Sequence, residues 1–159
     1  MKNWTYCLLL LLSGTALTQC NSAKTAAQAS STYDEKLAEE VGADDYGMKT
    51  YVMAFLNSGS SEGLDSLQRA KLQRGHLDNI TRLAEAGKLV LAGPFYGNDD
   101  DLRGIYVFDV RTLEEAQALT ETDPAIQAGT LEMDLRLWYG SAALMKVNEL
   151  HTKVAKKGI

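Results

Sequence analysis

The chain has 159 residues, of which 45% are hydrophobic and 23% are charged. These proportions are typical of one globular domain with some residues to spare, and they exclude a mainly disordered or collagen-like chain. The formal net charge of −5, from 16 Lys and Arg against 21 Asp and Glu, argues against a nucleic-acid-binding protein, which usually presents a basic face.

The N-terminus has the pattern of a secretory signal. One lysine, Lys2, precedes an apolar run from Cys7 to Leu12, and small residues extend that run to Leu17. A basic start followed by about 7–15 apolar residues is typical of a signal peptide. The run is shorter than the roughly 20 residues that a transmembrane helix needs. We therefore expect residues 1–19 to be a signal peptide and the protein to be exported to a bacterial cell envelope.

Two cleavage sites are open. Leu17-Thr18-Gln19-Cys20 resembles a bacterial lipobox, in which the cysteine receives a lipid and the chain is cut just before it, although a small residue is usual in place of Gln19. The alternative, Ala27-Gln28-Ala29, is an A-x-A site for ordinary signal peptidase and would give a soluble periplasmic or secreted protein. We favour lipidation of Cys20, and this anchor is then the only membrane contact that we expect.

Residues 20–47 are expected to form a flexible tether. They are rich in Ala, Ser and Thr and then acidic, although residues 33–41 have the pattern of a turn or two of helix. Both cysteines, Cys7 and Cys20, precede the domain that follows. Thiol catalysis, disulfides and cysteine-based metal sites are therefore excluded within that domain.

The domain, residues 48–147, is predicted to contain four strands and two helices. Apolar runs rich in strand-forming residues alternate along it with stretches of 3.6-residue apolar period. In chain order we expect a strand at 51–56, a helix at 66–86, strands at 88–95 and 102–110, a helix at 112–120 and a strand at 131–139. This βαββαβ order predicts an α+β, ferredoxin-like fold, in which two helices cover one face of an antiparallel four-stranded sheet. Residues 148–159 are expected to be a basic, solvated tail.

Both predicted helices carry end signals. Asp65 or Ser66 can cap the first helix, and Gly87 follows its last turn. Thr112 and Glu115 form a capping box for the second. The 3.6-residue period predicts that the first helix buries a stripe made of Leu67, Ala70, Leu77, Ile80 and Ala84.

Two helices can cover only one face of this sheet, yet two strands are apolar on both faces. Met53 and Phe55 alternate with Ala54, for example, and Val107 alternates with Tyr106. No other part of the chain is predicted to cover the second face, so we expect a homodimer that packs sheet against sheet around a two-fold axis. The alternative cover is the tether, folded back on the sheet.

One histidine, His76, lies inside the domain. On the predicted helix it shares an edge with Arg69 and Gln73, and a half-buried imidazole there needs a partner for its second nitrogen. The alternative to a functional histidine is a hydrogen-bonded structural one. Asp123, just before Pro124, has the same ambiguity, because Asp-Pro commonly ends a helix.

No motif indicates a nucleotide or a metal. The sequence has no G-x-G-x-x-G and no P-loop, and its two histidines lack the spacing of zinc ligands. The acidic run Asp99–Asp101 is expected to be an exposed turn rather than a cation site. We expect no cofactor and no metal. The bend Gly93-Pro94-Phe95 can bring backbone close to a ligand.

Several of these features together resemble the YciI-like (YCII-related) family over about residues 48–147. They are His76, the run Gly87–Phe95, Gly104, Asp123-Pro124, Ala128-Gly129 and Trp138. The resemblance implies a ferredoxin-like fold that dimerises into an α+β barrel. It also implies that His76 and Asp123 face each other in a cleft as an acid/base pair.

Related barrels include isomerases and dehalogenases of small lactones. The resemblance therefore implies a cofactor-free isomerase, lyase or dehalogenase acting on a small carboxylic acid or lactone. Gly93, Pro94, Phe95 and Trp138 would shape the pocket wall, Arg136 would hold a substrate carboxylate, and Arg69 is counted among the substrate-binding residues. The alternative is a ligand-binding or structural dimeric envelope lipoprotein without catalysis.

Overall fold

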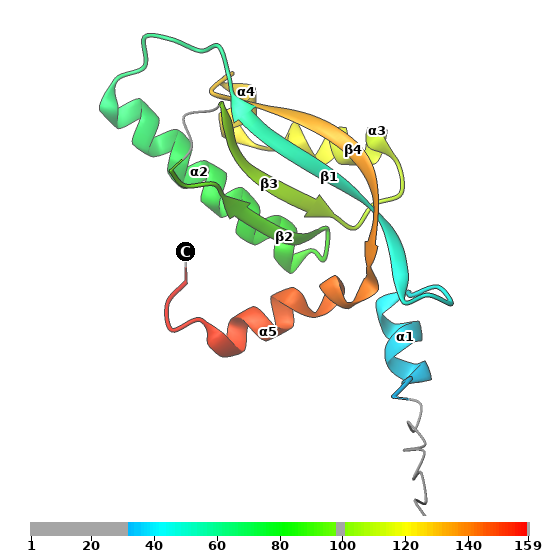
Figure 1. Ribbon diagram of the computed structural model, residues 1–159. Coiled ribbons are helices and arrows are strands. Elements are labelled where there is room, and N and C mark those ends of the chain that lie inside the picture. Colours follow the sequence, from blue (N-terminus) through cyan, green and yellow to red (C-terminus); the bar gives the residue numbers. More distant parts are fainter. Residues whose placement is uncertain (1–31, 98–100, 159) are drawn as a thin grey trace, which may run out of the picture. The chain divides into compact units, whose positions relative to one another are not determined.

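The computed structural model describes residues 32–97 and 101–158 (Figure 1). The predicted signal peptide, Cys20 and the first part of the predicted tether, as far as residue 31, lie outside the described residues, as does most of the acidic run Asp99–Asp101.

The described strands form one antiparallel sheet in the order β2-β3-β1-β4. β1 (Met48–Ser58) is central and pairs with β3 (Leu102–Phe108) on one side and β4 (Leu131–Ser141) on the other. β2 (Leu89–Pro94) forms a hairpin with β3. The predicted α+β fold, with its four-stranded antiparallel sheet, is confirmed.

One face of the sheet packs against α2 (Ser66–Glu85), α3 (Leu113–Thr120) and the short α4 (Pro124–Gln127) (Figure 1). A capping box begins each of α2 and α3. Asp65 pairs with Gln68 in α2, and Thr112 pairs with Glu115 in α3. The residues buried between the helices and the sheet are Val52, Ala54, Leu56, Leu83, Leu89, Tyr106, Phe108, Val110 and Ala116.

The predicted buried stripe of α2 is wrong at its N-terminal end. Leu67 is 79% exposed and Ala70 is exposed, whereas the buried residues of the helix are His76, Asn79 and Leu83. The first turns of α2 lie outside the core, so their apolar residues have nothing to pack against. Farther along the helix, polar side chains with partners inside the fold occupy the inward face.

The other face of the sheet is partly covered by the chain's own C-terminal segment, contrary to the expectation that no cover remained. The 3-10 helix η1 (Ala142–Lys146) and α5 (Val147–Val154) follow β4. Leu144 and Met145 of η1 pack with the buried Tyr51, Val90 and Val107. The segment predicted as a tail from residue 148 is therefore helical as far as Val154.

The compact unit begins at Asp34, earlier than the predicted start of the domain at Met48. The helix turns predicted within 33–41 are confirmed as α1 (Glu35–Val41), whose last residue is buried. The buried Lys49 explains why α1 packs against the domain, because its Nζ lies 3.2 Å from the Val41 carbonyl oxygen and 3.0 Å from Asp109. A buried ammonium needs such acceptors, and α1 supplies one of them.

The loops that carry Gly59 and Gly129 approach each other closely, so replacing Gly59 should destabilise the fold. A Cβ at Gly59 would lie 2.1 Å from the Gly129 carbonyl oxygen. The same loops are joined by the Gly59 amide to the Thr130 carbonyl at 2.9 Å. We expect Gly59→Ala to lower the free energy of unfolding by about 1–3 kcal/mol in urea denaturation.

The matched control is Gly93→Ala, because nothing lies within 4 Å of a Cβ built at that position. That variant should stay within about 0.5 kcal/mol of the wild type. Equal losses from the two substitutions would contradict the close approach at Gly59.

Candidate active site

The close approach of α2 to α4 brings His76 and Asp123 together. His76 lies in the middle of α2, and Asp123 is the N-cap residue of α4. Gly75 makes room for this approach, since a Cβ there would lie 3.1 Å from Cγ of Pro124. The two residues are 47 positions apart in sequence, so only the packed helices can bring them together.

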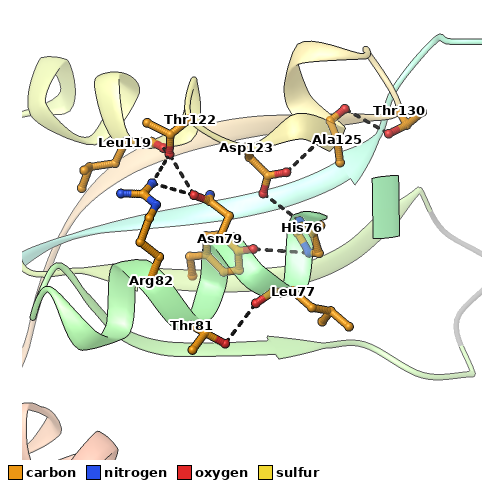
Figure 2. A network of polar contacts seen from close by, with 11 residues as sticks. His76, Leu77, Asn79, Thr81, Arg82, Leu119, Thr122, Asp123, Ala125 and Thr130 are labelled. Atoms are coloured by element: carbon orange, nitrogen blue, oxygen red, sulfur yellow. Dashed lines mark hydrogen bonds and ion pairs between the residues drawn. The ribbon is translucent and has the colours of Figure 1, made fainter. Parts of the chain in front are cut away.

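A short hydrogen bond joins the pair (Figure 2). Nδ1 of His76 lies 2.7 Å from Oδ2 of Asp123, whose side chain has no exposed surface. The other carboxylate oxygen, Oδ1, accepts the amide proton of Ala125 at 2.9 Å. Because both carboxylate oxygens have donors, the buried Asp123 side chain has its hydrogen-bonding capacity met inside the fold and holds the imidazole in one orientation.

Tyr106 of β3 is the third member of the cluster and was missed as a site residue from sequence. Its hydroxyl lies 3.3 Å from Nε2 of His76, and the two rings are stacked with centroids 6.1 Å apart. Burial raises the pKa of the Tyr106 phenol well above its ordinary value of 10, and the Asp123 carboxylate raises it further. The phenol is therefore protonated. In the tautomer that carries the imidazole proton on Nδ1, Nδ1 donates to Asp123 and the phenol donates to Nε2. The sequence offered one signal for it. A tyrosine within an apolar strand is expected to be buried, and a buried tyrosine hydroxyl needs a hydrogen-bond partner.

A second polar network fixes the residue that precedes Asp123 (Figure 2). Nη2 of Arg82 donates to Asn79 Oδ1 at 2.6 Å and to Thr122 Oγ1 at 2.7 Å. Thr122 in turn donates to the Leu119 carbonyl oxygen at 2.6 Å. These contacts join α2 to the end of α3, and they hold the chain segment that carries Asp123.

The predicted substrate-binding residues are dispersed. Arg69 lies on α2 two turns before His76, and its Nε donates to the Leu64 carbonyl oxygen. Gly93 and Pro94 belong to β2, where they pair with β3, and Phe95 follows them half-exposed.

Arg136 and Trp138 lie on the sheet face opposite to His76. In the β1–β4 register they stand beside Met53 and Tyr51, which belong to the cluster covered by η1. Trp138 contacts the Tyr51 ring, and Arg136 pairs with Asp134 at 2.7 Å. The predicted cleft in which both residues meet the His76 pair is therefore absent from the described fold.

Two open cavities lie away from His76. One, of about 520 Å³, lies between α3 and β4, and the other, of about 300 Å³, lies beside Lys49, Arg111 and Tyr139. Within residues 32–97 and 101–158, no three His, Cys, Asp or Glu side chains form a group that could hold a metal ion. No helix in the same ranges is long and apolar enough to cross a membrane.

Comparisons with known proteins identify the family. The YCII-related domain family matches residues 51–138, more than half of the chain, and the chain belongs to that family. The uncharacterized protein YjpA of Bacillus subtilis (strain 168) is 33% identical over 64 residues, which cover 40% of this chain and 72% of that protein. Among solved structures, 5-chloro-2-hydroxyhydroquinone dehydrochlorinase (TftG) of Burkholderia phenoliruptrix AC1100, in complex with 2,5-dihydroxybenzoquinone, is 21% identical. The TM-score is 0.41, with 55% of this chain and 92% of that chain covered.

The buried phenol of Tyr106 makes the free energy of unfolding depend on pH in the alkaline range. Because the pKa of Tyr106 is raised in the folded state, the unfolded chain loses its phenol proton first as the pH rises past about 10. The contribution of Tyr106 is therefore complete below that pH and lost above it. We expect the free energy of unfolding in urea to fall less steeply between about pH 9 and 11 in Tyr106→Phe than in the wild type.

Tyr46→Phe is the matched control, because the side chain of Tyr46 is 86% exposed. It should keep the wild-type slope. Identical slopes for Tyr106→Phe and the wild type would show that Tyr106 does not hold its proton more tightly in the fold.

Proposed function

We propose that the domain is a cofactor-free acid/base enzyme of the isomerase, lyase or dehalogenase type that acts on a small carboxylic acid or lactone. The observation that carries this proposal is the 2.7 Å contact between His76 Nδ1 and the fully buried Asp123. The carboxylate accepts a hydrogen bond from Nδ1–H, which keeps that proton on Nδ1 and leaves the lone pair of the imidazole on Nε2. It also stabilises the imidazolium that forms when Nε2 takes a proton.

Tyr106 completes the proposed chemistry. Its contact with Nε2, at 3.3 Å, is long for a hydrogen bond, so a substrate can replace it as the partner of Nε2. Nε2 would then take the proton from the carbon next to a carbonyl, and the Tyr106 hydroxyl would donate to the oxygen that gains negative charge. Arg69, on the same helix, offers a cation for the substrate carboxylate. His76 is 9% exposed, so the surrounding side chains must move to admit a substrate.

Proton exchange tests this role directly. The purified protein would be incubated in D₂O with a panel of small carboxylic acids and lactones, and deuterium uptake next to the carbonyl would be followed by NMR. We expect uptake into at least one compound, with a rate that falls about 10²–10⁴-fold in His76→Gln because the base is lost.

The matched control is His151→Gln, at the exposed second histidine of the chain, which should exchange at the wild-type rate. An exchange rate that His76→Gln leaves unchanged would contradict the proposal.

One observation favours a role without catalysis. Both ring nitrogens of His76 already have partners inside the chain, and the side chain is mostly buried. In a structural protein, His76→Gln would lower the free energy of unfolding by about 1–3 kcal/mol, and no compound of the panel would exchange. In a binding protein, a compound would raise the melting temperature of the wild type without exchanging protons.

We further propose that the protein is exported and anchored through a lipid on Cys20. The apolar run that ends at Leu17 and the adjoining Leu17-Thr18-Gln19-Cys20 support this proposal. In a bacterial host fed labelled palmitate, Cys20→Ser should lose the label and leave the membrane fraction, whereas Cys7→Ala should keep both. Label retained in Cys20→Ser would contradict the anchor, and cleavage after Ala29 would indicate the soluble alternative.

A further inference from the structure

The C-terminal helix α5 turns its apolar side chains outward. Leu150 and Val154, one turn apart, are 55% and 78% exposed. Asn148 lies on the other side of the helix, where its Nδ2 donates to the Leu89 carbonyl oxygen at the β2 edge of the sheet, at 2.8 Å. A helix of a globular protein normally turns its apolar stripe toward the core. The stripe made of Leu150 and Val154 is instead available to another surface.

Charge is divided unevenly between this segment and the rest of the compact unit. Residues 34–141 contain 10 Lys and Arg against 20 Asp and Glu, a net charge of −10. Residues 142–159 contain four lysines against one glutamate, a net charge of +3. An anionic surface would therefore attract the C-terminal segment and repel the rest of the domain, which favours one orientation of approach.

The lysines lie next to the apolar stripe. Lys153 precedes Val154, is 61% exposed, and pairs with Glu149 at 2.6 Å. Lys156 and Lys157 follow the last turn of α5, where they are exposed and pair with none of the acidic residues that the structure describes. Exposed apolar side chains with lysines beside them are typical of a helix that lies in the interface of a membrane.

The N-terminal helix lies at the same end of the domain. Lys146 of η1 forms an ion pair with Glu40 of α1, and α1 lies beside η1 in the fold (Figure 1). The chain that precedes Asp34 therefore enters the compact unit close to the C-terminal segment. If Cys20 carries a lipid, the 14 residues from there to Asp34 span at most about 50 Å, which keeps α5 within reach of the bilayer.

We propose that α5 and the lysines after it form a membrane-docking surface that binds an anionic lipid bilayer. Leu150 and Val154 enter the headgroup region, and Lys156 and Lys157 contact the lipid phosphates. Each lysine near such a surface strengthens binding roughly fivefold, so this contact is weak alone and gains from any tether that holds the domain at the membrane. The inference goes beyond the proposed role of His76 and uses none of its residues.

Vesicle flotation tests this surface without the N-terminal segment, whose apolar run would itself bind lipid. Residues 34–159 form the compact unit and contain both packed clusters, so they can be purified as a folded domain. The domain should float with vesicles of equal parts phosphatidylglycerol and phosphatidylcholine, and not with vesicles of phosphatidylcholine alone. Binding should weaken as the NaCl concentration rises above about 0.15 M, where the Debye length falls below about 8 Å.

Two double variants test the two components of the surface. Lys156→Gln with Lys157→Gln should weaken binding roughly tenfold or more, because two lysines are lost. Leu150→Ser with Val154→Ser should weaken it by a similar factor of about ten, because the apolar contact is lost. Both variants change exposed side chains and should keep the wild-type circular dichroism spectrum.

Matched controls make the same changes elsewhere on the domain. Lys71→Gln with Lys88→Gln changes two exposed lysines, and Leu67→Ser changes an apolar residue of α2 that is 79% exposed. Both controls should bind vesicles like the wild type.

Three outcomes would overturn the proposal. The first is a wild-type domain that does not float with the anionic vesicles. The second is a pair of C-terminal variants that bind like the controls, which would place the lipid contact on another surface. The third is a Leu150 and Val154 variant that loses self-association in sedimentation but still floats, which would show that a second copy covers the stripe. Because residues 34–159 lack Cys20, none of these outcomes bears on the proposed lipid anchor.

Discussion

The buried carboxylate of Asp123 is the constraint on which the helix side of the fold depends. A carboxylate without exposed surface is stable only when both oxygens have donors, and here these are the Ala125 amide and the His76 imidazole. One donor belongs to α4 and the other to α2, so satisfying this single group fixes how the two helices meet. Gly75 permits the contact by leaving room for Pro124. The same requirement that makes the packing specific also fixes the orientation of the His76 imidazole, on which the proposed acid/base chemistry rests.

The sheet separates this cluster from the surface that the C-terminal segment partly covers. His76, Tyr106 and Asp123 lie between the sheet and the helices, whereas η1 and α5 cover part of the opposite face. The C-terminal segment thus buries apolar surface that would otherwise need a partner, and it also protects the β2 edge through Asn148. The long β4 edge has no comparable cover in the described part of the chain.

Local patterns predicted the elements well because they depend on near neighbours. The strands follow apolar runs, and Asp65 and Thr112 cap the helices through side chains three residues from their partners. Which face of each helix is buried was harder to predict. The 3.6-residue period chose Leu67 and Ala70 for the core of α2, although both are exposed, because periodicity cannot show where a helix extends past the sheet it covers. The polar residues His76 and Asn79 are buried there instead.

By itself, the sequence indicated the family and the order of the four strands and the two long helices, which follow from local composition and short-range patterns. The pairing of His76 with Asp123 was implied only by the resemblance to the family. Only the tertiary structure decided that the pair meets at 2.7 Å, that Tyr106 joins it, and that Arg136 and Trp138 lie on the other face. The physical reason is that strand register and helix packing bring together groups far apart in the chain. Both are set by how the whole chain buries its apolar side chains while it pairs its buried polar groups.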